Sequence, residues 1–369
     1  MKYIEKFDVT KDEIIRVMDS SGKIINKDLM PEISLEETLE AYKIMNLSRR
    51  QDIFQNLVQR QGRLLSFLSS TGQEACEVAY SLNLIKGKDW FISGYRNNAA
   101  WITCGVPIKN VMLYWAGNEY GAKSPDGVNV LPPNIVIGSQ FSHATGIAFA
   151  EKYKGSDAIA LTVTGDGGMS EGEVFEAMNF AKVHESPVIF VCENNQWAIS
   201  TPRGEQTKSL NFAIKSIAVG IPSLKVDGND FLACYGVFKE VAQWVREGKG
   251  PFLVECETYR LGPHSSADNP DVYRDPKEFE DAKSRDPLIR LKTYLIKNKV
   301  WSDAQQEALD NEHDQYVKEQ FDWMEQNKAY PLEDIFNYTF AEKNDQLEEQ
   351  FEEARRFYEK YPNSVKGGH

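Results

Sequence analysis

The stretch that decides the fold runs from Ala158 to Thr201 and reads AIALTVTGDGGMSEGEVFEAMNFAKVHESPVIFVCENNQWAIST. Its first apolar run, Ala158–Thr164, ends at a glycine and has the composition of a buried strand. Apolar residues at helical spacing then predict a helix, and they are Val174, Ala177, Met178 and Ala181. A second apolar run, Val188–Cys192, predicts another strand. The stretch therefore predicts a strand–turn–helix–strand unit with two parallel strands.

Oxygen-bearing side chains follow both of these strands. Asp166 comes after the first strand and Asn195 after the second. Because the carboxyl ends of parallel strands meet at one edge of a sheet, we expect the two side chains to lie side by side. A carboxylate and an amide oxygen suit Mg²⁺, which completes its octahedron with phosphate oxygens and water. Gly167 and Gly168 let the backbone approach a ligand closely, and the following helix offers its N-terminus to phosphates. The stretch predicts a magnesium–diphosphate site.

A dinucleotide-binding turn is the nearest alternative, since Gly165-x-Gly167 also follows a strand. The third glycine of that fingerprint is missing, because Ser170 stands in its place. Gly-Asp-Gly alone and Asn-Asn alone are each common in structural turns. The two motifs together, separated by the 26 residues 168–193 between Gly167 and Asn194, form a more specific pattern than either motif alone.

Composition narrows the class of protein. The chain has 369 residues and a net charge of −13, which argues against non-specific binding to nucleic acid or to anionic membranes. The five cysteines are scattered and form no C-x-x-C pair, which favours free thiols in a reducing compartment. The N-terminal residues do not resemble a signal or transit peptide, and no apolar stretch approaches the roughly 18 residues of a membrane span. We expect a cytoplasmic protein with no membrane partner.

Further strands and helices alternate along the chain. Strands are predicted at 88–92, 135–137, 223–226 and 252–258, and helices are predicted to start at Ser34 with Glu37 in a capping box, near Ser70 with a hydroxyl cap, at Ser139 and at Phe231. This alternation predicts an α/β fold with a doubly wound, mostly parallel sheet. We expect an N-terminal arm and first helix (1–48), the α/β domain (49–300) and a helical C-terminal extension (301–369), whose acidic segment 345–360 faces solvent or another subunit.

Two basic side chains sit where ligand contacts are common in such folds. Arg96 follows the predicted strand 88–92, and His264 lies in a loop rich in Gly, Pro, Ser and Asp after the strand 252–258. From the residues alone, an exposed loop residue is the more common explanation of each.

Six motifs occur in order along the chain: Gly72-Gln73-Glu74-Ala75, Gly94-Tyr95-Arg96, Ile137-Gly138-Ser139-Gln140, Ala198-Ile199-Ser200-Thr201-Pro202, Val226-Asp227-Gly228, and Tyr259-Arg260 with Gly262-Pro263-His264-Ser265. With the Gly-Asp-Gly and Asn-Asn pair, they make the chain resemble the alpha subunits of thiamine-diphosphate-dependent 2-oxo acid dehydrogenases. The resemblance covers roughly residues 45–300.

The resemblance implies the roles of particular residues. Mg²⁺ would be held by Asp166, by the side chain of Asn195 and by the backbone carbonyl of Trp197, which stands where the family usually has Tyr or Phe. The cofactor, thiamine diphosphate, would be bound by Tyr95, Arg96, Ile135, Ile137, Asp166, Gly167, Gly168, Asn195 and His264. His264 would lie over the reactive carbon and act as the catalytic residue that orients or protonates intermediates.

The resemblance also implies partners and a substrate class. A beta subunit would supply the activating glutamate in an assembly of two alpha and two beta chains. The product acyl group would pass to a lipoyl group on an acyltransferase. Glu193 and Gly138-Ser139-Gln140 favour a pyruvate-type subunit over a branched-chain type. Ser265 occupies the position that is phosphorylated in mitochondrial relatives.

Three other classes of protein remain as alternatives. A self-sufficient thiamine enzyme would need a second α/β domain, for which the chain has little room. A nicotinamide dehydrogenase is disfavoured by Ser170 and the Asn pair. A scaffold subunit without chemistry is disfavoured by the presence of Asp166, Asn195 and His264 together.

Overall fold

The central sheet has five parallel strands in the order β1-β2-β3-β7-β6. The computed structural model describes residues 1–362. The strands are β1 (Trp90–Ile92), β2 (Ala160–Gly165), β3 (Val188–Asn194), β7 (Phe252–Glu257) and β6 (Ser223–Asp227). Neighbouring strands are parallel throughout, so the carboxyl ends of β1, β2 and β3 lie at one edge. The predicted strand–turn–helix–strand unit is present as β2, α6 (Gly172–Val183) and β3.

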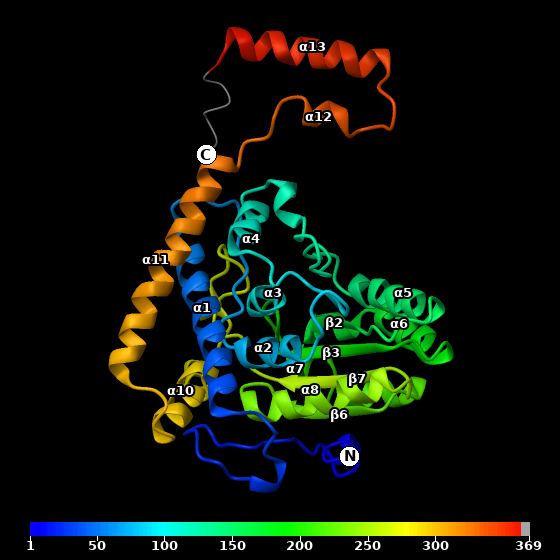
Figure 1. Cartoon of the computed structure of the whole chain (residues 1–369), viewed down its shortest axis with the longest axis vertical. Coiled ribbons are helices and arrows are strands. Elements are labelled where there is room, and N and C mark those ends of the chain that lie inside the picture. The colour runs from blue at the N-terminus through cyan, green and yellow to red at the C-terminus, as the bar shows by residue number, and fades with distance from the viewer. Residues whose placement is uncertain (363–369) are drawn as a thin grey trace.

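Helices cover both faces of this sheet (Figure 1). On one face, α2 (Glu74–Leu82), α3 (Asn98–Cys104) and α8 (Phe231–Arg246) pack against one set of alternating strand residues, which includes Leu161 and Val163. On the other face, α5 (Ser139–Tyr153) and α6 pack against the intervening residues, which include Ala160 and Phe190. Strands buried on both faces explain the continuous apolar runs in the sequence. The predicted doubly wound α/β fold is confirmed.

Two long helices flank the α/β core. Helix α1 (Leu35–Arg60) packs against α11 (Asp303–Asn327), and α11 packs against α4 (Ile108–Trp115). The predicted capping box is present at the start of α1: Ser34 Oγ accepts from the Glu37 N–H, and the Glu37 carboxylate accepts from the Ser34 N–H. Helix α10 (Pro287–Lys297) also contacts α1.

The remaining elements are short, apart from the last helix. They are η1 (Val9–Lys11), η2 (Lys27–Leu29), η3 (Glu119–Ala122), η4 (Asp166–Ser170), η5 (Ala213–Val219), η6 (Pro270–Val272), α7 (Arg203–Gln206), α9 (Pro276–Lys283), α12 (Asp334–Asn337), α13 (Asp345–Lys360) and the antiparallel pair β4 (Trp197–Ala198) and β5 (Thr201–Pro202). The N-terminal segment packs on the sheet, where Ile15 bridges to Val226.

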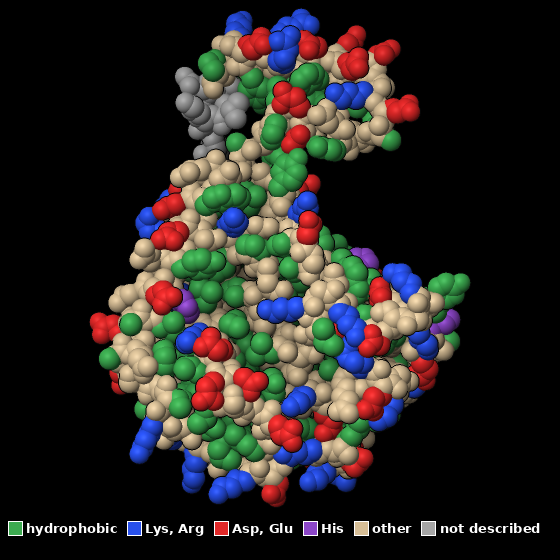
Figure 2. Space-filling model, in the orientation of Figure 1, with side chains coloured by type: hydrophobic (Ala, Val, Ile, Leu, Met, Phe, Trp, Pro, Cys, Tyr) green, Lys and Arg blue, Asp and Glu red, His purple; other side chains and the backbone are tan. Residues whose placement is uncertain are grey.

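The C-terminal segment α12–α13 projects from the body beyond the end of α11 (Figure 1). No residue of α13 is buried. Hydrophobic side chains are exposed on this segment among acidic and basic ones (Figure 2), and they include Tyr338, Phe340 and Phe357.

Two local predictions are wrong. Residues 135–137 form a loop rather than a strand, and their three side chains are exposed. The hydrogen bonds at the edge of β1 are made earlier in the chain, where Phe91 pairs with Asn129 and Leu131. Helix α2 starts after Gln73, which makes no side-chain cap. The hydroxyl of Ser70 accepts from the Asn98 N–H at the start of α3 instead.

Candidate functional site

A cavity of about 240 Å³ opens at the carboxyl ends of the strands. Its lining includes eight of the nine residues predicted to bind the cofactor: Tyr95, Arg96, Ile137, Asp166, Gly167, Gly168, Asn195 and His264. Trp197 lines it as well. Ile135 does not, although it lies in the same exposed loop as Ile137. The fold therefore brings together residues that are up to 169 positions apart in the sequence.

Asp166 is a buried carboxylate with an unused oxygen. It is 1% exposed, and its Oδ2 has no hydrogen-bond partner among residues 1–362. Burial raises the pKa of Asp166 to about 6, although the backbone N–H groups of Asp166 and Asn195 act in the opposite direction. An isolated buried carboxylate is costly unless a cation or a donor reaches it. Asp166 therefore fits the role of a ligand for a hard cation.

Two further oxygens belong to the expected metal ligands. Asn195 Oδ1 accepts from the Trp197 N–H at 3.2 Å, so the amide oxygen is on the side of the Trp197 backbone. The Trp197 carbonyl accepts from Arg260 Nη1 at 3.1 Å and has a second lone pair available. Within residues 1–362 no three His, Cys, Asp or Glu side chains converge as a metal cage. One carboxylate, one amide and one carbonyl suit Mg²⁺, which is held by few protein groups beside substrate phosphates.

The glycines of the turn leave no room for side chains. A Cβ on Gly168 would lie 2.0 Å from Thr164 Oγ1, and a Cβ on Gly167 would lie 3.0 Å from Ala198 Cβ. The turn is also tied to a distant loop, because Gln206 Nε2 donates to the Asp166 carbonyl. The backbone after β2 is thus exposed to the cavity without intervening side chains.

Two buried guanidinium groups line the cavity, and neither forms an ion pair with a carboxylate in the part of the chain that the structure describes. Arg96 donates from Nη1 to the Ser69 carbonyl at 2.6 Å and from Nη2 to the His264 carbonyl at 2.5 Å. Burial lowers the pKa of Arg96 to about 10, so it is still charged at neutral pH. Arg260 donates to the Trp197 and Ile199 carbonyls and to the Tyr273 hydroxyl. Buried cations without anionic partners attract an anion, and diphosphate has this chemistry.

His264 lies at the mouth of this cavity. Arg96 Nη2 lies 3.3 Å from His264 Nδ1. A guanidinium can only donate, so Nδ1 is the acceptor and the ring proton resides on Nε2. Burial, together with the charge of Arg96, lowers the pKa of His264 to about 4. The backbone N–H of His264 donates to Asp268 Oδ2 at 2.7 Å, and the imidazole packs edge-on against the Tyr95 ring. The neutral imidazole is therefore held in one tautomer.

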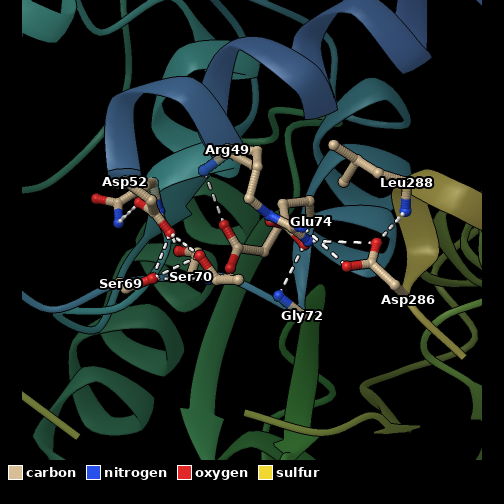
Figure 3. A network of polar contacts seen from close by, with 12 residues as sticks. Arg49, Asp52, Ser69, Ser70, Gly72, Glu74, Asp286 and Leu288 are labelled. Carbon is tan, nitrogen blue, oxygen red and sulfur yellow. Dashed lines mark hydrogen bonds and ion pairs between the residues drawn. The ribbon is translucent and has the colours of Figure 1, made fainter. Parts of the chain in front are cut away.

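Buried ionic contacts behind the cavity hold its walls (Figure 3). Asp52 accepts from the hydroxyls of Ser69 and Thr71 at 2.6 and 2.9 Å, and burial raises its pKa to about 7. This fixes Ser69, whose carbonyl holds Arg96. Arg49 bridges Glu74 and Asp286, which caps α10.

Several residues that line the cavity have no role predicted from the sequence. They are Gln73, Asn97, Gln140, Glu171, Glu193 and Arg260. Gln73, Gln140 and Arg260 stand in the motifs that carried the resemblance, and Glu193 entered only as a sign of substrate type. Asn97 had no signal beyond its place next to Arg96.

No helix among residues 1–362 combines the length and apolar character that crossing a membrane requires.

Comparison with known proteins places this geometry in a family. A family model described as "Dehydrogenase E1 component" matches residues 42–333. The pyruvate dehydrogenase E1 component subunit alpha of Acholeplasma laidlawii is 40% identical over 343 residues, which is 92% of this chain and 99% of that protein. The subunits of the same name from Mycoplasma genitalium and Staphylococcus aureus (strain Mu50) are 35% and 36% identical. They cover 94% and 93% of this chain, and 96% and 93% of their own lengths are matched. The chain belongs to the dehydrogenase E1 component family, and the curated relatives named above are all alpha subunits.

Proposed function

We propose that this chain is the alpha subunit of a pyruvate dehydrogenase component. It would act with thiamine diphosphate and Mg²⁺ in the oxidative decarboxylation of pyruvate and the reductive acetylation of a lipoyl group. The observation that carries this proposal is the pairing of opposite charges in one cavity. Asp166 has an oxygen free for a cation, and Arg96 and Arg260 have no carboxylate partner. A magnesium diphosphate supplies both missing partners.

The residues that line the cavity would hold the metal and the cofactor. Asp166, the Asn195 side chain and the Trp197 carbonyl would hold the metal. Gly167 and Gly168 would offer backbone N–H groups to the diphosphate, and Tyr95 and Arg96 would bind its oxygens. Ile137 would line the cleft, and the exposed Ile135 would reach the cofactor only if a partner chain covers its loop. The cofactor supplies an electron sink for the carbanion left by decarboxylation.

His264 would donate a hydrogen bond and orient reaction intermediates. Its neutral imidazole carries a proton on Nε2, so this atom can donate a hydrogen bond to a substrate oxygen. A group that stays neutral at pH 7 and is held by Arg96 and Asp268 can orient an intermediate without adding charge. Ser265, directly after His264, would be the position at which phosphorylation could act.

A beta subunit would complete the site. A cavity of about 240 Å³ is smaller than the roughly 300–1,000 Å³ of typical small-molecule sites, so it suits only part of a large cofactor. Ile137 and Ile199 at its rim are exposed, which suits a partner surface. We propose two alpha and two beta chains, working with a lipoyl acyltransferase in the cytoplasm. Residues 49–300 would form the cofactor-binding domain, between the arm (1–48) and the C-terminal extension (301–369).

Turnover by the co-expressed alpha and beta chains tests the proposal. With thiamine diphosphate, Mg²⁺ and an artificial electron acceptor, we expect pyruvate to be consumed faster than 3-methyl-2-oxobutanoate. Faster consumption of the branched acid would make the chain a branched-chain subunit with the same site. Cofactor binding without turnover of either acid would favour a scaffold subunit.

A further inference from the structure

Three buried side chains form a chain of hydrogen bonds behind the proposed metal site. Asn195 Nδ2 donates to Gln73 Oε1 at 2.9 Å, and Gln73 Nε2 donates to Glu193 Oε2 at 2.7 Å. All three residues are at most 5% exposed. We call this set the amide chain. It joins the N-terminal end of α2 to Glu193, near the end of β3, and to Asn195, which follows β3.

A backbone N–H group fixes the direction of the amide chain. The Gly94 N–H donates to Asn97 Oδ1 at 2.9 Å, so Asn97 turns its amino group to Glu193 Oε2 at 3.2 Å. Glu193 Oε2 accepts from both Asn97 and Gln73, and the amide oxygen of Gln73 faces Asn195. At the other end, the Trp197 N–H donates to Asn195 Oδ1. A backbone N–H can only donate, so the Trp197 N–H excludes the reversed orientation of Asn195 and, through the bond to Asn195, that of Gln73.

We propose that Gln73 is a positioning residue for the metal: it holds the Asn195 amide with its oxygen toward the cation and its amino group away. This inference rests on the proposed function, in which Asn195 Oδ1 is a ligand. A flipped Asn195 would point an amino group at the cation and would lose its bonds to both Gln73 and Trp197. Groups behind a metal ligand that fix its orientation commonly contribute tenfold or more to metal affinity.

Hydrogen bonds hold the residues on both sides of Gln73, and Figure 3 shows Gly72, Glu74 and Arg49 of this set. The Gly72 N–H donates to Glu74 Oε2 at 2.9 Å, and Arg49 Nε donates to Glu74 Oε1 at 2.5 Å. Thr258 Oγ1 donates to the Gly72 carbonyl at 2.6 Å. Gly72 has φ +103°, and a Cβ there would lie 2.2 Å from the Tyr259 carbonyl oxygen. The turn therefore admits only glycine before Gln73, and Gln73 is presented to Asn195 in one position.

Magnesium titration of the purified complex with the beta subunit tests this role. The readout is the Mg²⁺ concentration that gives half-maximal binding of thiamine diphosphate, followed by intrinsic tryptophan fluorescence. We expect Gln73→Met to raise this concentration at least tenfold while the melting temperature stays close to that of the unchanged protein. Gln51→Met is the matched control: Gln51 is also a buried glutamine, but it bonds to Gln55 on α1 and is not part of the amide chain.

A double variant separates positioning from other effects. If Gln73 acts through Asn195, Gln73→Met combined with Asn195→Ala requires no more Mg²⁺ than Asn195→Ala alone. An unchanged Mg²⁺ requirement in Gln73→Met would overturn the inference, as would a double variant with additive losses. Asp166→Ala tests the underlying function separately, because an unchanged Mg²⁺ requirement in that variant would mean that the metal site itself is misassigned.

Discussion

Replacing Asp166 by Asn should stabilise the cofactor-free chain and abolish its metal binding. Burial raises the pKa of this carboxyl from 3.8 to about 6. One pKa unit corresponds to about 1.4 kcal/mol, so keeping Asp166 ionised at pH 7 costs the folded state about 3 kcal/mol. The folded state binds the proton more tightly than the unfolded state, so this cost is absent below pH 3.8 and grows as the pH rises to about 6. An asparagine at position 166 carries no charge, so the folded Asp166→Asn variant does not bear this free-energy cost.

Urea unfolding of the metal-free full chain at several pH values measures this effect. We expect the free energy of unfolding of Asp166→Asn to exceed that of the unchanged protein by up to about 3 kcal/mol at pH 7, with a smaller difference at pH 5. The same variant should bind thiamine diphosphate equally weakly with and without Mg²⁺, because the anionic ligand is gone.

Asp230→Asn is the matched control. Burial raises the pKa of Asp230 to about 6 as well, but its carboxylate accepts from three backbone N–H groups and pairs with Arg290. Removing one partner of a buried ion pair costs about 3–5 kcal/mol, so this variant should be destabilised. If Asp166→Asn loses as much stability as Asp230→Asn at pH 7, Asp166 is a structural group and the reasoning fails.

Three more variants probe the cavity. In urea unfolding, Gly168→Ala should lower the free energy of unfolding by about 1–3 kcal/mol, because its Cβ would lie 2.0 Å from Thr164 Oγ1. Gly172→Ala is the control: its Cβ would meet nothing within 4 Å, so its free energy of unfolding should be unchanged or slightly higher. Equal free energies of unfolding for the two variants would contradict the predicted clash. Arg96→Met should weaken thiamine diphosphate binding by the complex at least tenfold in a fluorescence titration, and unchanged affinity would remove Arg96 from the diphosphate site. His264→Ala should bind cofactor but transfer acetyl groups poorly. Because the His264 pKa is about 4, the transfer rate of the unchanged enzyme should show no titration of this group between pH 5.5 and 8, and a step near pH 6.5 that disappears in His264→Ala would contradict its neutral state.

The sequence predicted those parts of the fold that follow from local pattern. Strands β2 and β3 are continuous apolar runs that end at glycine or polar residues, and their carboxyl ends bring Asp166 and Asn195 into one cavity. The failure at residues 135–137 has a simple cause. An apolar run predicts burial, but these three side chains are exposed, so hydrophobicity alone did not distinguish an exposed loop from a buried strand.

The polar support of the site could not be read from the sequence. Gln73 and Glu193 are 120 positions apart, and their hydrogen bond depends on the packing of α2 against the sheet. The sequence also could not show that Arg96 and Arg260 are buried without a carboxylate partner among residues 1–362, because a loop arginine in a sequence gives no sign of its burial. The sequence predicted a helical segment at 345–360, which is the range of α13. Its projection from the body could not be predicted, because it depends on the connection through α12.

The most direct test of the account is a crystal structure of the alpha–beta complex with thiamine diphosphate and Mn²⁺ in place of Mg²⁺. Anomalous scattering locates the metal independently of the cofactor. We expect one peak within ligand distance of an Asp166 carboxylate oxygen, Asn195 Oδ1 and the Trp197 carbonyl, with diphosphate oxygens completing the coordination. A metal bound elsewhere, or a diphosphate bound without contact to Arg96, would contradict it.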